Sequence, residues 1–291
     1  MSLKPLTHRY KESRNDLVQW WFNRQIHPEA ASVLEQICDR AGPHVFVAIT
    51  FEQPWVAKWL RDSFHRFALE GSLLVFADNS RSEEARREIK ALANEGTIYL
   101  PLPKNPWRHF NRSHGSAMIW IFDRLQAAGL KTERFSFIDH DLIPVAPIRI
   151  KEELQSQPYY GLLNLGFDEV CYSLWAGFCH YDWKAVAEKK LNFLTDVPRR
   201  LDTGGRNWGR LYQQFPREEI RFADQRIATY RDEHGEAHLL EVLDDCWIHL
   251  GRVGHHTSRL EERRAFYRFL EAELKAGAKL SDFELPATST G

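Results

Sequence analysis

Short apolar runs alternate with helical patterns along the first half of the chain. β-Branched and aromatic residues gather in runs of about four to eight residues, which is typical of buried strands. The expected strands are residues 44–51, 73–77, 97–100 and 135–138. Around them, apolar residues recur every third or fourth position, and the expected helices are 1–40, 54–67, 82–95 and one capped by Asn111 or Ser113 that runs to Gly129. The alternation favours a parallel sheet with helices on both faces.

The second half is less regular. Expected strands are residues 159–165 and 170–178, with a strand pair at 238–242 and 246–250. Expected helices are 183–191, 207–215 and 258–275, followed by a frayed tail from 281 to 291. Neither an internal repeat nor a Pro/Gly/Ser-rich linker divides the chain, so we expect one domain.

Composition excludes several classes of protein. The chain has 291 residues, 43% hydrophobic and 27% charged with both signs present, so it is neither disordered nor collagenous. Apolar stretches stay well short of the ~20 residues that cross a bilayer, and the N-terminus lacks a secretory pattern, so we expect a soluble, cytoplasmic protein. The net charge of −1 does not favour nucleic-acid binding, and the four cysteines form no C-x-x-C pair and are expected to be reduced.

Asp139 and Asp141 are the most informative residues. They directly follow the apolar run 135–138, at the carboxyl end of an expected buried strand, where ligands of open α/β sheets bind. Two carboxylates held there repel each other unless a cation lies between them, and Mg²⁺ or Mn²⁺ prefers such oxygen ligands. The alternative is an exposed acidic turn.

This order of motifs resembles the GT-A fold of nucleotide-sugar glycosyltransferases, nearest to the non-processive family-2-like members, over about residues 44–255. The resemblance implies a mixed central sheet with a Rossmann-like front half. It divides the expected single domain into an N-terminal helical segment 1–40, a nucleotide-binding half 44–145, an acceptor half 146–257, and a C-terminal helix and tail 258–291. It implies that Asp139 and Asp141 hold the metal on the donor diphosphate, with His249 as a third ligand. The implied nucleoside contacts are Thr50, Phe51, Glu52, Asp78 and Asn79.

For His249, the alternative is a half-buried strand histidine bonded to backbone. A second pair of histidines, His255 and His256, lies nearby in the sequence, but without thiolates they do not favour a zinc site.

Further candidates surround these positions. Asp202, in Leu-Asp-Thr-Gly-Gly, is the candidate catalytic base for an acceptor hydroxyl, or else a turn residue, with Asp168, Glu169 and Asp182 in reserve. Trp175 and Gly177 lie in a stretch that lines the sugar site of the resembled fold, although a core tryptophan fits equally well. In the basic loop 104–116, Arg112, Ser113 and Ser116 could contact a diphosphate at a helix N-terminus, unless the loop is only solvated.

The sequence therefore predicts a metal-dependent glycosyltransferase. Its expected partners are a UDP- or GDP-sugar donor and an acceptor glycan, lipid-linked sugar, metabolite or modified nucleic acid base. One alternative is an aspartate-nucleophile (HAD-like) phosphatase, with Asp244 and Asp245 as its late acidic pair. Another is a catalytically inactive binding module of the same fold.

Overall fold

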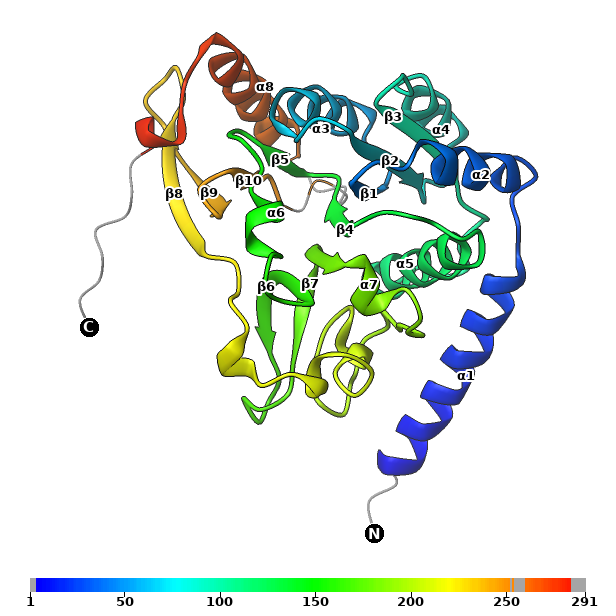
Figure 1. Cartoon of the computed structure of the whole chain (residues 1–291). Coiled ribbons are helices and arrows are strands. Elements are labelled where there is room, and N and C mark those ends of the chain that lie inside the picture. Colours follow the sequence, from blue (N-terminus) through cyan, green and yellow to red (C-terminus); the bar gives the residue numbers. More distant parts are fainter. Residues whose placement is uncertain (1–3, 252, 254–259, 284–291) are drawn as a thin grey trace.

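The strands of the computed structural model form two sheets (Figure 1). The structure describes residues 4–251, 253 and 260–283. The strands are β1 (His44–Thr50), β2 (Ser72–Asp78), β3 (Thr97–Pro101), β4 (Arg134–Asp139), β5 (Leu142–Pro144), β6 (Tyr159–Leu165), β7 (Tyr172–Asp182), β8 (Gln225–Arg231), β9 (Ala237–Leu243) and β10 (Trp247–His249).

The helices are distributed along the whole chain. They are α1 (Lys4–Arg24), α2 (Ala30–Arg40), α3 (Pro54–Phe67), α4 (Glu83–Lys90), α5 (Phe110–Ala127), α6 (Ile150–Glu153), α7 (Trp183–Val186) and α8 (Leu260–Ala276). Within the described residues, four 3₁₀ turns add η1 (Gly205–Asn207), η2 (Tyr212–Gln214), η3 (Arg217–Glu219) and η4 (Leu280–Asp282).

The larger sheet has the order β3-β2-β1-β4-β7-β6. Its first four strands are parallel, whereas β7 runs antiparallel to β4 and β6 antiparallel to β7. The smaller sheet, β5-β10-β9-β8, is antiparallel. The expected α/β class with a mixed central sheet is therefore confirmed.

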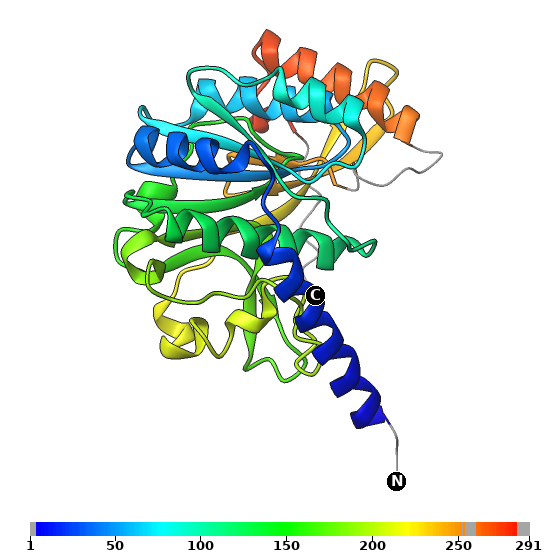
Figure 2. The same cartoon turned by 90° about the vertical axis from the view of Figure 1, so that its right-hand side faces the viewer.

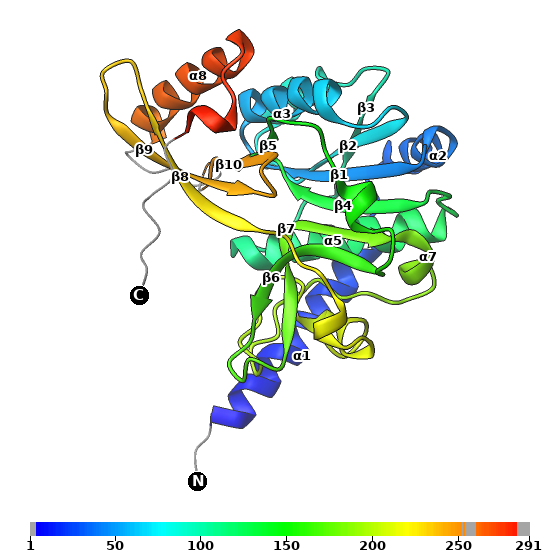
Figure 3. The same cartoon turned by 60° about the vertical axis from the view of Figure 1, so that its left-hand side comes forward.

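Strand β1 shows why this sheet needs cover on both faces. All seven of its residues are buried. Because successive side chains of a strand point to opposite faces, both faces of the sheet must be covered here. Val45, Val47 and Ile49 join a core with residues of α2 and α5. Phe46 and Ala48 join a second core with residues of α3, α8 and the smaller sheet. Figures 2 and 3 show the larger sheet with helices on both of its faces.

Several expected helices are shorter than the apolar pattern indicated. The helix expected at 82–95 ends at Lys90, because residues 94–97 form a turn with a bridge between Asn94 and Thr97. The one expected at 183–191 is only Trp183–Val186, and the chain then turns to bury Leu191 in the core.

The helix expected at 207–215 is absent. Two 3₁₀ turns, η1 and η2, take its place, and Gly209 lies inside the expected range. Glycine is unfavourable in a helix interior, which explains the difference.

Helix α5 begins earlier than expected. It starts at Phe110 after His109, so Asn111 and Ser113 do not cap it. Strands β5 and β8 were not expected, since β5 has only three residues and the exposed strand β8 lacks a strong apolar pattern. Among the described helices, none combines the length and apolarity needed to span a bilayer.

A buried polar cluster joins three neighbouring strands of the larger sheet. The Ser136 hydroxyl on β4 lies 2.6 Å from His44 Nε2 on β1 and 2.7 Å from His180 Nδ1 on β7. Burial lowers the pKa of both imidazoles, that of His180 to about 3. Both histidines are therefore neutral in the folded protein at physiological pH.

This cluster predicts acid sensitivity. An unfolded histidine takes up a proton below about pH 6.5, whereas folded His180 does not until about pH 3, so stability is lost as the pH falls below about 6.5. Between about pH 6.5 and 5, His180 should account for about 1.6 kcal/mol of the fall in the free energy of unfolding. Urea unfolding of the wild type and His180→Gln should show a shallower acid slope in the variant. Equal slopes would contradict the prediction.

Candidate active site

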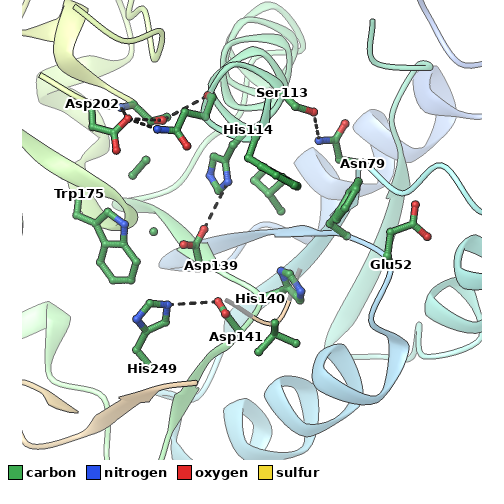
Figure 4. A pocket seen from close by; sticks show the side chains of 18 of the residues that line it. Glu52, Asn79, Ser113, His114, Asp139, His140, Asp141, Trp175, Asp202 and His249 are labelled. Carbon is green, nitrogen blue, oxygen red and sulfur yellow. Dashed lines mark hydrogen bonds and ion pairs between the residues drawn. The ribbon is translucent and has the colours of Figure 1, made fainter. Parts of the chain in front are cut away.

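A cavity of about 760 Å³ opens at the carboxyl ends of the parallel strands. This volume is in the range of small-molecule sites. Its wall comes from β1, β4, β7, the start of α5, the loop after β2, the end of β10 and the segment around Asp202 (Figure 4). The lining residues include Phe51, Glu52, Asn79, Arg81, Arg108, Asn111, Ser113, His114, Asp139, His140, Asp141, Trp175, Gly177, Asp202 and His249.

Asp139, Asp141 and His249 form a cluster in this cavity. Asp139 ends β4, Asp141 precedes β5, and β10 pairs with β5 so that His249 lies opposite Leu142. The short turn from β4 to β5, together with the pairing of β5 with β10, therefore places His249 beside Asp139 and Asp141. One ligand atom from each of the three residues lies within 4.8 Å of the others.

Two carboxylates hold the His249 ring. Its Nε2 lies 3.6 Å from Asp141 Oδ1, and its Nδ1 lies 2.5 Å from Glu241 Oε2. Glu241 is on β9, directly opposite His249 in the strand register. His249 is thus a side-chain-paired residue, and not a strand histidine bonded only to backbone.

The electrostatics of the cluster follow from these contacts. Burial would raise the pKa of the Asp141 carboxyl, but His249 lowers it to about 2. Burial acts to lower the pKa of His249, yet Asp141 and Glu241 outweigh it and raise this pKa to about 10. Burial raises the pKa of Asp139, and the negative charge of Asp141 adds to this while His114 opposes it. A protonated imidazole is therefore the positive charge in the cluster.

Two histidines beside the cluster were not expected from the sequence. His114 Nδ1, on α5, lies 3.5 Å from Asp139 Oδ1 (Figure 4). Its Nε2, and Nε2 of His140, are buried without a hydrogen-bond partner among the described residues. His140 stands between the two aspartates in the sequence, and His114 falls in the loop-to-helix segment that the basic pattern singled out. The position of His140 between the two aspartates and the position of His114 in the basic segment are the sequence features that indicate these residues.

The expected nucleoside contacts divide into two groups. Phe51, Glu52 and Asn79 line the cavity, but Thr50 and Asp78 do not. Asp78 is fully buried, and its carboxylate accepts hydrogen bonds from the Tyr99 hydroxyl at 2.9 Å, the Ser80 amide at 2.9 Å and the Thr50 hydroxyl at 3.3 Å. The Asp78 contacts hold the ends of three strands together behind the wall of the cavity.

Glu52 shapes the loop after β2. It adopts a left-handed backbone with φ of 56°, which is unfavourable for a residue with a side chain. Its carboxylate accepts hydrogen bonds from the amides of Arg81 and Ser82 at 2.6 and 3.2 Å. These bonds hold the Arg81 backbone at the cavity wall.

Of the three residues expected to contact a diphosphate, Ser113 lines the cavity, whereas Arg112 and Ser116 do not. Ser116 is fully buried and donates to Gln19, and Arg112 lies over the Trp107 ring beside a separate small cavity. Both point away because the start of α5 packs against α1 on that side. Arg81 and Arg108 are instead the arginines that line the main cavity.

Asp202, Trp175 and Gly177 all line the cavity, as expected. Asp202 Oδ1 accepts hydrogen bonds from Asn111 Nδ2 at 2.5 Å and from the Thr203 amide at 2.8 Å. The Trp175 ring contacts the His249 ring with 4.8 Å between centroids. A Cβ on Gly177 would lie 2.3 Å from Asp139 Oδ2, so glycine leaves room for that carboxylate.

Other candidates fall outside the cavity. Asp168 bonds within its own loop, Asp182 caps α7, and Glu169 is exposed. Asp244 and Asp245 form the turn between β9 and β10 and do not line the cavity. His255 and His256 lie outside the described residues.

Comparisons with known proteins give structural likenesses only. No protein-family model and no curated protein matches the chain. Its fold is similar to that of solved glycosyltransferases. They include mouse xyloside xylosyltransferase 1, with 12% identity and a TM-score of 0.34 over 50% of this chain and 69% of that one.

Two further structures are similar. The bifunctional glycosyltransferase WbbM has 14% identity and a TM-score of 0.32, over 57% of this chain and 30% of that chain. The S. cerevisiae mannosyltransferase Ktr4p has 9% identity and a TM-score of 0.30, over 61% and 66%. These likenesses cover part of the chain and concern the fold alone.

The raised pKa of His249 predicts alkaline sensitivity of the metal-free protein. The stabilisation is complete below about pH 6.5, the unfolded value, and is lost as the pH rises toward about 10. The free energy of unfolding should therefore fall between about pH 7 and 9 more steeply in the wild type than in His249→Gln, by up to about 1.4 kcal/mol per pH unit. Urea unfolding without divalent ions measures this. Parallel profiles would show that the ring is not held as an imidazolium.

Proposed function

We propose that the protein is a metal-dependent glycosyltransferase of the GT-A type. It moves a sugar from a nucleoside diphosphate sugar to an acceptor hydroxyl. The observation that carries the proposal is the cluster of Asp139, Asp141 and His249 at the strand ends, inside a cavity large enough for a nucleotide sugar. The cavity also contains two arginines, which suit a diphosphate, and an exposed carboxylate, Asp202, which suits a base.

The donor set of the cluster fits a divalent ion. Asp139, Asp141 and His249 would hold it, and an imidazole beside two carboxylates favours Mn²⁺ over Mg²⁺. Glu241 accepts from His249 Nδ1, the contact that commonly orients a metal-ligating histidine. A bound ion would neutralise the negative charge of the departing nucleoside diphosphate.

The other lining residues have roles in this proposal. Phe51, Glu52 and Asn79 contact the nucleoside, and Arg81 and Arg108 face the diphosphate. Trp175 and Gly177 form the wall of the sugar site. Asp202 takes the proton of the acceptor hydroxyl, and the bond from Asn111 fixes the orientation of its carboxylate.

The partners and compartment remain those that the sequence favours. The donor is a UDP- or GDP-sugar, and the acceptor is a glycan, a lipid-linked sugar, a metabolite or a modified base. The enzyme works in the cytoplasm, where its four cysteines stay reduced. The phosphatase alternative is disfavoured because Asp244 and Asp245 lie outside the cavity.

Nucleotide binding tests the proposal directly. Calorimetry should detect UDP or GDP binding that requires Mn²⁺, and Asp141→Ala should lose it, because one of two carboxylate ligands is gone. Asp39→Ala, an exposed aspartate on α2, is the matched control and should bind as the wild type does. Circular dichroism checks that both variants fold.

Three results would contradict the assignment. One is unchanged Mn²⁺ and nucleotide affinity in Asp141→Ala. Another is stabilisation of the wild type by phosphate analogues with Mg²⁺ but not by any nucleoside diphosphate, which would favour the phosphatase. The third is binding of nucleotide without sugar transfer to any acceptor or water, which would instead favour the inactive module.

The role of Asp202 is tested by Asp202→Asn. The amide keeps the size of the side chain and can still accept from Asn111, but it cannot take a proton. Turnover, measured as donor-dependent product release, should fall by about 10²–10⁴, the usual contribution of a general base, while donor affinity stays unchanged. Asp168→Asn, an exposed aspartate outside the cavity, should keep full turnover. Full turnover in Asp202→Asn would assign the base elsewhere.

A further inference from the structure

Helix α1 has one face packed on the protein and one face free. Its buried face carries Asn15, Gln19 and Phe22, and Gln19 accepts a hydrogen bond from Ser116 of α5. Asn23 adds a bond to Asp123 of α5 at 3.3 Å. Figure 2 shows that the N-terminal part of the helix stands away from the rest of the molecule.

The free face carries large apolar side chains. Tyr10, Leu17, Trp20 and Trp21 have exposed fractions of 71%, 64%, 52% and 48%. At 100° per residue these positions fall in one stripe opposite the buried face. We call this stripe, together with Arg14 and Arg24, the α1 aromatic face. Exposed apolar side chains gathered in this way mark an interaction site rather than ordinary surface.

The acidic residues of α1 pair with the protein body, whereas Arg14 and Arg24 lie on the α1 aromatic face. Arg206 of the protein body contacts Asp16 at 2.5 Å and Glu12 at 3.8 Å, so both acidic side chains pair with a positive charge on that side. The described residues of the α1 aromatic face include two arginines, Arg14 and Arg24, and no acidic residue. The helix sequence has five lysine or arginine residues against two acidic ones, although the whole chain has a net charge of −1.

Tryptophan, tyrosine, leucine and arginine on one free helix face fit a particular partner. Aromatic rings favour the boundary between lipid headgroups and acyl chains, and arginines favour anionic headgroups. The Arg24 guanidinium lies 3.4 Å from the Trp20 ring centroid, so charge and aromatic surface are presented together. We propose that the α1 aromatic face docks the protein on an anionic lipid surface, with the helix lying in the interface.

A second copy of the chain fits this face less well. Helices that pair with each other use continuous apolar seams of the leucine and isoleucine type. Pairing through the α1 aromatic face would bring arginines of two copies together, which like-charge repulsion disfavours. The proposal is independent of the sugar-transfer chemistry, because none of these residues lines the main cavity.

Vesicle sedimentation of the full chain tests the proposal. The protein should sediment with vesicles of phosphatidylcholine and phosphatidylglycerol, much less with phosphatidylcholine alone, and less at high salt. The double variant Trp20→Ala/Trp21→Ala and the charge variant Arg14→Glu/Arg24→Glu should each bind the anionic vesicles at least about tenfold more weakly. Circular dichroism and the melting temperature show whether each variant is folded.

A matched pair of leucines provides the control. Leu17 and Leu239 are both highly exposed, at 64% and 71%, but Leu239 is on β9, on the other side of the molecule from α1 (Figures 1 and 3). Leu17→Ser should weaken vesicle binding, and Leu239→Ser should not.

Three outcomes would overturn the proposal. They are no sedimentation with either vesicle, equal binding by the wild type and both double variants, and a dimer in solution that the same variants dissociate. The last would assign the face to a second copy. Mn²⁺-dependent nucleotide binding should be unchanged in all of these variants, so failure here leaves the proposed function standing.

Discussion

The turn from β4 to β5 is the constraint on which the candidate site depends. Only His140 separates Asp139 from Asp141, yet β4 belongs to the larger sheet and β5 to the smaller one. Because β10 pairs with β5, and β9 with β10, this turn brings His249 and Glu241 to carboxylates about 100 residues earlier in the chain. The two sheets meet at the residues that carry the charge, so the complete cluster requires the strand pairing of the smaller sheet.

The negative charges of Asp139 and Asp141 are partly balanced by the positive charge of His249. Two aspartates so close together, Asp141 buried and Asp139 partly buried, need positive charge nearby, and the raised pKa of His249 makes its imidazolium the source of that charge at neutral pH. A divalent ion would supply more charge at the same place and would take the Nε2 lone pair, so the proton on that nitrogen must leave when the ion binds. Glu241 accepts from Nδ1, on the far side of the ring from Asp141, so this contact would hold the ring in the same orientation if Nε2 were to bind an ion.

The sequence predicted those parts of the fold that depend on local pattern. The four parallel strands, α3, and the Asp139–Asp141 pair at a strand end follow from apolar runs and their punctuation. Asp78 and Ser116 were misjudged because burial by partners distant in sequence, such as Tyr99 and Gln19, decides where a polar side chain points. Glu241 and His114 were missed since strand register and helix rotation, which no short motif encodes, bring them to the cluster. Gly209 lies inside the expected helix 207–215, where glycine is unfavourable, and 3₁₀ turns take the place of that helix.

Helix α5 links the two surfaces for which functions are proposed. One side of its first turns gives Asn111 and His114 to the cavity, and the other gives Ser116 to Gln19 of α1. Ser113, between them, accepts a hydrogen bond from Asn79 at 3.0 Å and so joins the helix to the loop after β2. A helix buried along most of its length transmits position with little freedom, because close-packed interiors resist deformation. If α1 lies on a lipid surface, α5 fixes the orientation of the cavity relative to that surface, and acceptors held in the same surface would reach it from a restricted range of directions.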